Sequence, residues 1–348
     1  MEFGYSYFDN KLVILQEKIY AMIAPIDILG IGKAKPKKEV LSSDIDKLQN
    51  LKEGTTQKIT SLEKRYFLDE SQNASELLYE AINEALNHAK LSIDDIDCII
   101  NASATNQQAI PFNAASTHEL LNPKRPIPSF DINMTCLSVL RAFDIASKLF
   151  DSYKKILIVS CDIASIGLDW SNIRTAGIFA DGASAMIVTS SLSGGIILSN
   201  FETHSSGYEY CTIRGGGHKI NPNNYDGDYK SMSYFEMNGK KLYKLSSFIL
   251  PPFIKNSLAS KNLTLDDMDW IVPHQASQSS LNHIIKMLNI DKSKLIDIFK
   301  THANQVASSI PSALHTLLHT KDVKSGQKVM IIGTSAGVGL GLVIWQVP

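Results

Sequence analysis

The stretch Leu91-Ser92-Ile93-Asp94-Asp95-Ile96-Asp97-Cys98-Ile99-Ile100 returns later in the chain as Leu263-Thr264-Leu265-Asp266-Asp267-Met268-Asp269-Trp270-Ile271-Val272. Each residue has its counterpart 172 positions further on, close to half of the 348 residues. Five of the ten pairs are identical and four others are conservative. We interpret this agreement as an internal duplication, in which each copy of one α/β unit contains a helix, an acidic turn and a buried strand.

The order of expected elements supports two similar halves. We expect the boundary at Ser193-Gly194-Gly195, which gives an N-terminal half of residues 22–192 and a C-terminal half of residues 193–348. Helical and strand-like periodicities alternate in both halves, as expected for stacked α/β layers. The first half has expected helices at 75–90 and from 137, and strands at 26–32, 97–101, 129–132, 155–160 and 185–189. The second has helices at 241–260, 277–288 and after 307, and strands at 270–272, 328–332 and 340–346.

Composition excludes several classes of protein. The chain is 44% hydrophobic and 20% charged with a net charge of −1, which is ordinary for a globular protein and leaves no basic surface for nucleic acid. Residues 1–21 include charged side chains that rule out a signal peptide or membrane span, and we treat them as an N-terminal extension. The four cysteines form no Cys-x-x-Cys pair and have no histidine at metal-ligand spacing. We therefore expect no metal centre, and a reducing, cytoplasmic location.

Cys136 lies where a short strand passes into a helix. The positive end of the helix dipole favours a thiolate there, and we expect it to lower the thiol pKa by about one unit. The alternative is a buried structural cysteine, which describes most single cysteines in cytosolic proteins.

His274 and Asn304 occupy related places in the second half. His274 follows an expected strand, and Asn304 lies in a loop that enters a helix, near position 308, the counterpart of Cys136. Each could simply cap a loop or a helix. Because two helix entrances of a duplicated fold would face each other, the three residues together predict one shared pocket.

The segment Gly333-Thr334-Ser335-Ala336-Gly337-Val338-Gly339-Leu340-Gly341 could be mistaken for a dinucleotide-binding loop. Such a loop needs a helix and another strand after it, and only seven residues remain. We expect these glycines to let backbone amides approach a reacting oxygen.

From about Met22 to its end the chain resembles the thiolase superfamily, specifically the β-ketoacyl-acyl carrier protein synthase III family. The resemblance implies a thiolase-like five-layer αβαβα fold built from two duplicated halves, and a homodimer. The matching motifs are Cys136 at a helix start, Val272-Pro273-His274-Gln275-Ala276, Asn304 with Ala307-Ser308-Ser309-Ile310-Pro311, Phe179-Ala180-Asp181-Gly182-Ala183, Thr60-Ser61-Leu62-Glu63-Lys64-Arg65 and the terminal glycine loop.

The resemblance also implies a reaction. Cys136 would be acylated by a primer thioester, with the backbone amides of Cys136 and of Ala336 or Gly337 holding the oxyanion. His274 and Asn304 would assist loss of CO2 from a malonyl thioester, and the product would be a β-ketoacyl thioester for fatty-acid or related acyl-chain biosynthesis. Coenzyme A or phosphopantetheine thioesters would be substrates, acyl carrier protein a partner, and no metal or redox cofactor would be needed.

Several positions depart from the family pattern. The tryptophan and arginine that contact coenzyme A fall near Thr55 and Ile59, and a docking arginine falls at Ser279. Around the nucleophile, Leu137-Ser138 replaces a small residue and glycine, and the terminal loop lacks the family's consecutive glycines. Preference for acetyl-coenzyme A is therefore supported less well than condensing chemistry.

Other positions suggest how substrates are bound. Ile110 falls near the family's aromatic gate, which suggests a longer or branched primer, while Arg174, Lys244 and Lys286 are candidate contacts for a phosphopantetheine carrier.

Three other functions compete with this prediction. Within the superfamily, the chain could be an acyltransferase or an enzyme that joins two acyl chains head to head. Retention of both His274 and Asn304 favours decarboxylative condensation, because simple transfer does not need both donors. A papain-type hydrolase has a similar Cys-His-Asn order, but it requires a different nucleophile segment from Met134-Thr135-Cys136-Leu137-Ser138. The third is a non-catalytic dimer partner.

Overall fold

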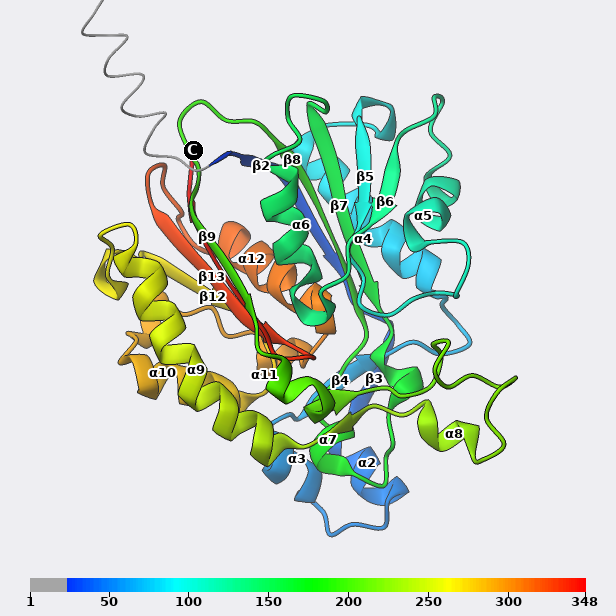
Figure 1. Cartoon of the computed structure of the whole chain (residues 1–348). Coiled ribbons are helices and arrows are strands. Elements are labelled where there is room, and N and C mark those ends of the chain that lie inside the picture. Colours follow the sequence, from blue (N-terminus) through cyan, green and yellow to red (C-terminus); the bar gives the residue numbers. More distant parts are fainter. Residues whose placement is uncertain (1–23) are drawn as a thin grey trace, which may run out of the picture.

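The structure contains two five-stranded sheets, and four strands of each follow the same order (Figure 1). They belong to a computed structural model that describes residues 24–348, so the predicted extension 1–21 lies outside the described residues. In these four strands two long antiparallel pairs adjoin one parallel pair, and the fifth strand lies at opposite edges in the two sheets. The first sheet has the order β2 (Asp27–Ala34), β8 (Gly182–Thr189), β7 (Lys155–Asp162), β5 (Cys98–Asn101), β6 (Ser129–Asp131). The second has the order β1 (Ala24–Pro25), β9 (Gly195–Thr203), β14 (Gly339–Gln346), β13 (Lys328–Ser335), β12 (Trp270–Pro273).

The repeated ten-residue stretches adopt the same local structure. Each begins with a short 3-10 turn closed by a capping box, in which the Ser92 amide donates to Asp95 at 2.8 Å and the Thr264 amide to Asp267 at 2.7 Å. Each then enters a strand that pairs in parallel with its neighbour. The duplication predicted from the sequence is thus visible in the structure.

Helices fill three layers around the two sheets. The pair α6 (Ser138–Ala146) and α12 (Ser309–Thr320) lies between the sheets and contacts both. The helices α4 (Ala74–Ala89) and α5 (Asn113–Leu121) cover the outer face of the first sheet, and α9 (Gly239–Ala259) and α10 (Gln278–Leu288) cover that of the second. The five-layer αβαβα prediction is confirmed.

Side-chain alternation explains why the sheets are covered on both faces. In β13, Val329 and Ile331 pack into the central layer, whereas Met330 and Ile332 pack under the outer helices. The sequence of β13 is therefore continuously apolar from Val329 to Ile332.

Residues 38–67, where the sequence analysis predicted no helix or strand, contain small elements at one end of the sheets. These are β3 (Lys38–Leu41), α2 (Ser42–Leu48), α3 (Thr55–Thr60) and β4 (Lys64–Phe67). The other short elements are α7 (Ile173–Ala176), β10 (Cys211–Thr212), α8 (Tyr229–Met232), β11 (Glu236–Met237) and α11 (Phe299–His302). The 3-10 turns are η1 (Ile93–Asp95), η2 (Thr135–Leu137), η3 (Ala164–Gly167), η4 (Ser205–Tyr210), η5 (Leu265–Asp267), η6 (Lys292–Lys294) and η7 (Val306–Ser308).

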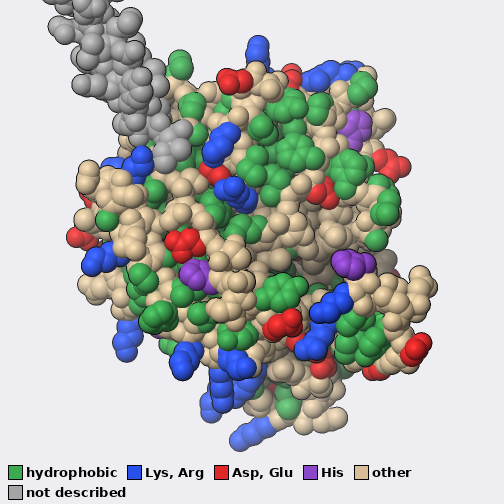
Figure 2. All heavy atoms as spheres, in the orientation of Figure 1, with side chains coloured by type: hydrophobic (Ala, Val, Ile, Leu, Met, Phe, Trp, Pro, Cys, Tyr) green, Lys and Arg blue, Asp and Glu red, His purple; other side chains and the backbone are tan. Residues whose placement is uncertain are grey.

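The surface mixes chemical types. On the face in Figure 2, hydrophobic, acidic and basic side chains are interspersed, and lysines and arginines gather along the lower edge. Within residues 24–348, no helix combines the length and apolar character needed to cross a membrane.

Candidate active site

Both central helices begin with the same unusual turn. The 3-10 turns η2 and η7 precede α6 and α12, and the first residue of each has a positive φ, 47° at Thr135 and 53° at Val306. A β-branched residue rarely adopts this conformation, so both halves keep a strained turn at the helix entrance. By this correspondence Cys136 matches Ala307, one residue from the predicted position, and Asn304 immediately precedes the second turn.

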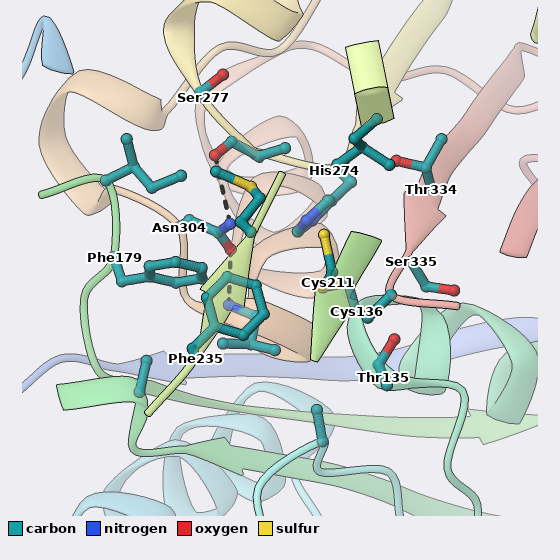
Figure 3. A pocket seen from close by; sticks show the side chains of 18 of the residues that line it. Thr135, Cys136, Phe179, Cys211, Phe235, His274, Ser277, Asn304, Thr334 and Ser335 are labelled. Atoms are coloured by element: carbon teal, nitrogen blue, oxygen red, sulfur yellow. Dashed lines mark hydrogen bonds between the residues drawn. The ribbon is translucent and has the colours of Figure 1, made fainter. Parts of the chain in front are cut away.

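The structure brings the three predicted polar residues to one cavity. Cys136, His274 and Asn304 all line a cavity of about 1150 Å³, and they surround it from different elements in Figure 3. Cys136 comes from the first half, and the other two come from the second. The cavity therefore lies at the junction of the two halves.

Two backbone N–H groups near the Cys136 sulfur favour its thiolate and so lower its pKa. One is its own N–H and the other belongs to Ala336. Burial nevertheless raises the pKa of the Cys136 thiol to about 12, with a further contribution from the charge of Asp162. The expected lowering of this pKa is wrong, because desolvation of the thiolate outweighs the helix dipole and the two amides.

His274 is buried at the end of β12. Its backbone N–H donates to the Ile332 carbonyl at 2.8 Å, and its side chain packs beside Gly333, where an added Cβ would lie 2.8 Å from the His274 Cβ. Burial lowers the pKa of the imidazole to about 4, so the ring is neutral at pH 7. Nδ1 has no hydrogen-bond partner among the described residues.

The carboxamide of Asn304 is fixed in orientation. Oδ1 accepts from the Val306 N–H at 2.9 Å, and Nδ2 donates to the Ala276 carbonyl at 3.3 Å. The Asn304 backbone pairs with the first half, donating to Ile178 O at 2.9 Å and accepting from Ala180 N at 3.0 Å. The side chain can offer its remaining N–H to a ligand.

Comparisons with known proteins agree with this geometry. Residues 130–207 match the family model described as 3-oxoacyl-[acyl-carrier-protein (ACP)] synthase III, and residues 258–347 match the model of its C-terminal part. A β-ketoacyl-[acyl-carrier-protein] synthase III of Wolbachia pipientis subsp. Culex pipiens is 30% identical over 321 residues, which cover 91% of this chain and 98% of the relative. The chain belongs to the β-ketoacyl-[acyl-carrier-protein] synthase III family.

Two further members of the synthase III family are similar over nearly their whole length. The Clostridium perfringens protein of the same name is 30% identical over 318 residues, covering 90% of this chain and 97% of the relative. The crystal structure of the Aquifex aeolicus 3-oxoacyl-[acyl-carrier-protein] synthase III superimposes with a TM-score of 0.81 at 26% identity, covering 92% of this chain and 99% of that one.

The other site residues predicted for this synthase III family member divide into two groups. Ala336, Gly337 and Arg174 line the cavity. Ile110, Lys244 and Lys286 are not among its lining residues, and all three are exposed, Ile110 by 87%.

Part of the cavity wall was not foreseen. The segment 205–234, which is rich in Gly, Asn, Tyr and Asp, supplies several lining residues, including Cys211, and Phe235 follows it. The Phe179 and Phe235 rings pack edge to face with centroids 5.2 Å apart. Cys211 is close enough for its charge to affect the Cys136 pKa. The sequence feature that could have indicated these lining residues was a cysteine and an aromatic residue in or beside a stretch rich in Gly and Asn.

No metal site accompanies these residues in the described part of the chain, where no group of three or more His, Cys, Asp or Glu side chains could hold an ion.

Proposed function

We propose that this protein catalyses decarboxylative Claisen condensation of an acyl thioester primer with malonyl-acyl carrier protein or malonyl-coenzyme A. The product is a β-ketoacyl thioester, formed through acyl-Cys136, in fatty-acid or related acyl-chain biosynthesis. The observation that carries the proposal is the convergence of Cys136, His274 and Asn304 on one cavity, which Ala336 also lines. The synthase III relatives, aligned along nearly the whole chain, support it.

The first step acylates Cys136. Its sulfur attacks the primer carbonyl, the carbon–sulfur bond of the incoming thioester breaks, and the leaving thiol takes up the proton that the Cys136 thiol loses. The N–H groups of Cys136 and Ala336 are the proposed donors to the tetrahedral oxyanion. Such a donor typically lowers the barrier by about 3–4 kcal/mol.

The second step uses His274 and Asn304. Loss of CO2 from the malonyl group leaves negative charge on its thioester oxygen, and the Nε2–H of neutral His274 and the Nδ2–H of Asn304 are the proposed donors to that oxygen. The resulting carbanion attacks the acyl carbonyl, and the bond to the Cys136 sulfur breaks. A histidine held neutral by burial suits this role, because it donates without titrating near pH 7.

The dimensions of the cavity bear on the primer. About 1150 Å³ is far more space than an acetyl group needs, and the wall includes apolar residues such as Ile178, Phe179 and Leu281. A longer or branched acyl chain is therefore the proposed primer, carried by coenzyme A or by phosphopantetheine.

The proposal also covers the protein partner, the cellular location and the oligomeric state. Acyl carrier protein is the proposed partner, with Arg174 at the cavity and the exposed Lys244 and Lys286 as its basic contacts. A cytoplasmic homodimer is proposed, and the exposed Ile110 suits a contact between subunits. The two structural units are proposed to be residues 22–192 and 193–348. The chemistry requires neither a metal nor a redox cofactor.

The decisive experiment follows both steps on one sample. The protein is mixed with a panel of acyl thioesters, acylation is read by intact-mass spectrometry, and carboxyl-labelled malonyl-acyl carrier protein is then added. We expect an adduct on Cys136, release of labelled CO2 and a β-ketoacyl product. Acyl uptake without CO2 release would instead assign an acyltransferase or a head-to-head condensing enzyme, and uptake by a Cys136→Ala variant would refute the nucleophile.

A further inference from the structure

A buried carboxylate joins the two halves beside the cavity. Asp162 ends β7 and is fully buried. Its Oδ1 accepts from the backbone N–H groups of Ala104 at 2.8 Å and Thr105 at 2.9 Å, and from the Thr105 hydroxyl at 3.2 Å. Its Oδ2 accepts from the Ala307 N–H at 3.0 Å. One carboxylate therefore connects a wall segment of the first half with the turn that follows Asn304.

These contacts lie at functional positions. Ala104 and Thr105 line the cavity. Ala307 is the structural counterpart of Cys136, and its neighbour Val306 donates the N–H that orients the Asn304 carboxamide. Displacement of Ala307 would consequently be transmitted to Asn304.

A contribution to folding stability does not explain why a carboxylate is buried at Asp162. No lysine or arginine of residues 24–348 forms an ion pair with Asp162. Burial raises the pKa of Asp162 to about 6, which shows that its charge is held in an unfavourable environment. A buried charge without a cation costs stability even when it is hydrogen-bonded.

Neutral contacts hold the same turn from the first half. The Ser308 and Ser160 hydroxyls lie 2.7 Å apart, and Gln305 donates to the Asp181 carbonyl at 3.3 Å. Asp162 adds a charged acceptor to these contacts between the two halves, which together we call the seam.

We propose that Asp162 is a positioning residue whose carboxylate fixes the turn 304–308, and with it the Asn304 carboxamide, against the cavity wall at Ala104 and Thr105. The inference rests on the proposed function, because it assigns Asn304 to the condensation step. Asp162 itself does not touch the reacting atoms.

Replacement by asparagine separates two effects. Asp162→Asn keeps the size of the side chain but replaces one acceptor oxygen with an NH2 group, which faces N–H donors and displaces the segments they belong to. It also removes the negative charge that raises the pKa of Cys136. Condensation should therefore weaken while the nucleophile becomes more reactive.

The test measures three quantities in wild type, Asp162→Asn and Asp46→Asn. They are the rate of primer transfer to Cys136, the rate of CO2 release from pre-acylated enzyme, and the pH dependence of iodoacetamide alkylation of Cys136. For Asp162→Asn we expect CO2 release to fall about 10- to 100-fold, primer transfer to stay within about threefold, and alkylation to shift to lower pH. Asp46→Asn is the matched control, because this buried carboxylate likewise accepts from backbone N–H groups, those of Gly54 and Thr56, and from a threonine hydroxyl, that of Thr56, but forms no hydrogen bond to the turn 304–308. Its ratio of CO2 release to primer transfer should match that of wild type.

The experiment distinguishes failure of the proposed function from failure of the positioning role of Asp162. Wild-type enzyme that acquires the primer but releases no CO2 refutes the proposed function. Wild-type condensation with equal losses of both steps in Asp162→Asn, or with no loss of CO2 release, refutes the positioning role. If Asp162→Asn does not fold, Asp162→Ser, whose hydroxyl still accepts one hydrogen bond, is measured in the same way and judged by the same ratio.

Discussion

At the scale of single residues, the Cys136 thiol must react with a substrate although its sulfur is buried. Because burial raises the pKa of its thiol to about 12, the thiolate is rare at neutral pH. Iodoacetamide reacts with the thiolate, so its rate of reaction with Cys136 should rise about tenfold per pH unit from pH 7 to 10. Peptide mass spectrometry after timed alkylation measures this, with Cys136→Ser as the background. A plateau below pH 9 would contradict the buried environment.

The second-half residues should act on one step only. His274→Ala or Asn304→Ala should leave acylation of Cys136 within a few-fold of wild type and slow CO2 release by about 10²- to 10³-fold, since each removes one donor to the developing charge. Rapid-quench assays of both steps measure the effect. An equal loss of acylation in either variant would contradict the division of roles.

Cys211 should influence chain length. It is buried in the cavity wall and electrostatically close to Cys136, so Cys211→Phe should fill space beside the acylated sulfur. We expect the longest primer accepted to become shorter, whereas Cys211→Ser, which keeps the volume, should preserve the range. Competition among acyl thioesters read by intact mass tests this, and an unchanged range in Cys211→Phe would place the acyl chain elsewhere.

The sequence could predict some of these residues but not others. His274 and Asn304 were predictable because each follows a recognisable strand or precedes a periodic helix. Cys211 was not, because its approach to Cys136 depends on how a nonperiodic segment packs in three dimensions, which no local sequence pattern indicates. The Cys136 pKa was misjudged because a helix dipole can be read from sequence, but the extent of desolvation cannot.

At the scale of elements, most of the longer helices and strands were predicted to within a few residues, but α5 and β9 were not predicted. The expected helix 277–288 is α10, Gln278–Leu288, and the expected strand 155–160 is the first part of β7. The elements between residues 33 and 67 were missed, since they are short and pack on one another rather than presenting one long apolar face.

Helix α4 lies very close to strand β2 at the glycines of this strand. A Cβ at Gly32 would lie 2.2 Å from the Ala81 carbonyl oxygen of α4. Gly32→Ala should therefore force helix and sheet apart and lower the free energy of unfolding by about 1–3 kcal/mol. Urea denaturation measures it. Gly217→Ala, where the added Cβ has no neighbour within 4 Å, is the control and should change stability by less than about 0.5 kcal/mol.

At the scale of the whole molecule, duplication places chemistry at the seam between halves. The offset of 172 residues predicted the repeated architecture and the convergence of Cys136, His274 and Asn304. The offset could not predict the buried polar contacts between the two halves. It relates residues at equivalent positions of the two halves, whereas these contacts join residues at different positions. One such cluster lies away from the cavity: Lys33 Nζ is 3.1 Å from His302 Nε2, and His315 Nε2 is 2.9 Å from Glu84 Oε1.

This seam should make the protein sensitive to acid. Burial lowers the pKa of His274, His302 and His315 to about 4, against 6.5 for an unperturbed histidine. Between those values the unfolded chain binds more protons, so stability falls as the pH falls from about 6.5 to 4. From pH 7 to 5 each histidine should remove up to about 2 kcal/mol. The raised pKa of Asp162 acts in the opposite direction and should restore roughly 1 kcal/mol as that group protonates below pH 6.

Urea denaturation at pH 7 and pH 5 tests the net effect, which should be a loss of stability in wild type. His315→Gln keeps a donor for Glu84 but removes one titrating ring from the seam, so the same change of pH should cost it less by up to about 2 kcal/mol. If wild type is equally stable at both pH values, or if His315→Gln loses as much stability as wild type, the buried histidines are already accessible to protons in the folded protein. The seam would then be a hydrated gap rather than a packed junction between the two halves.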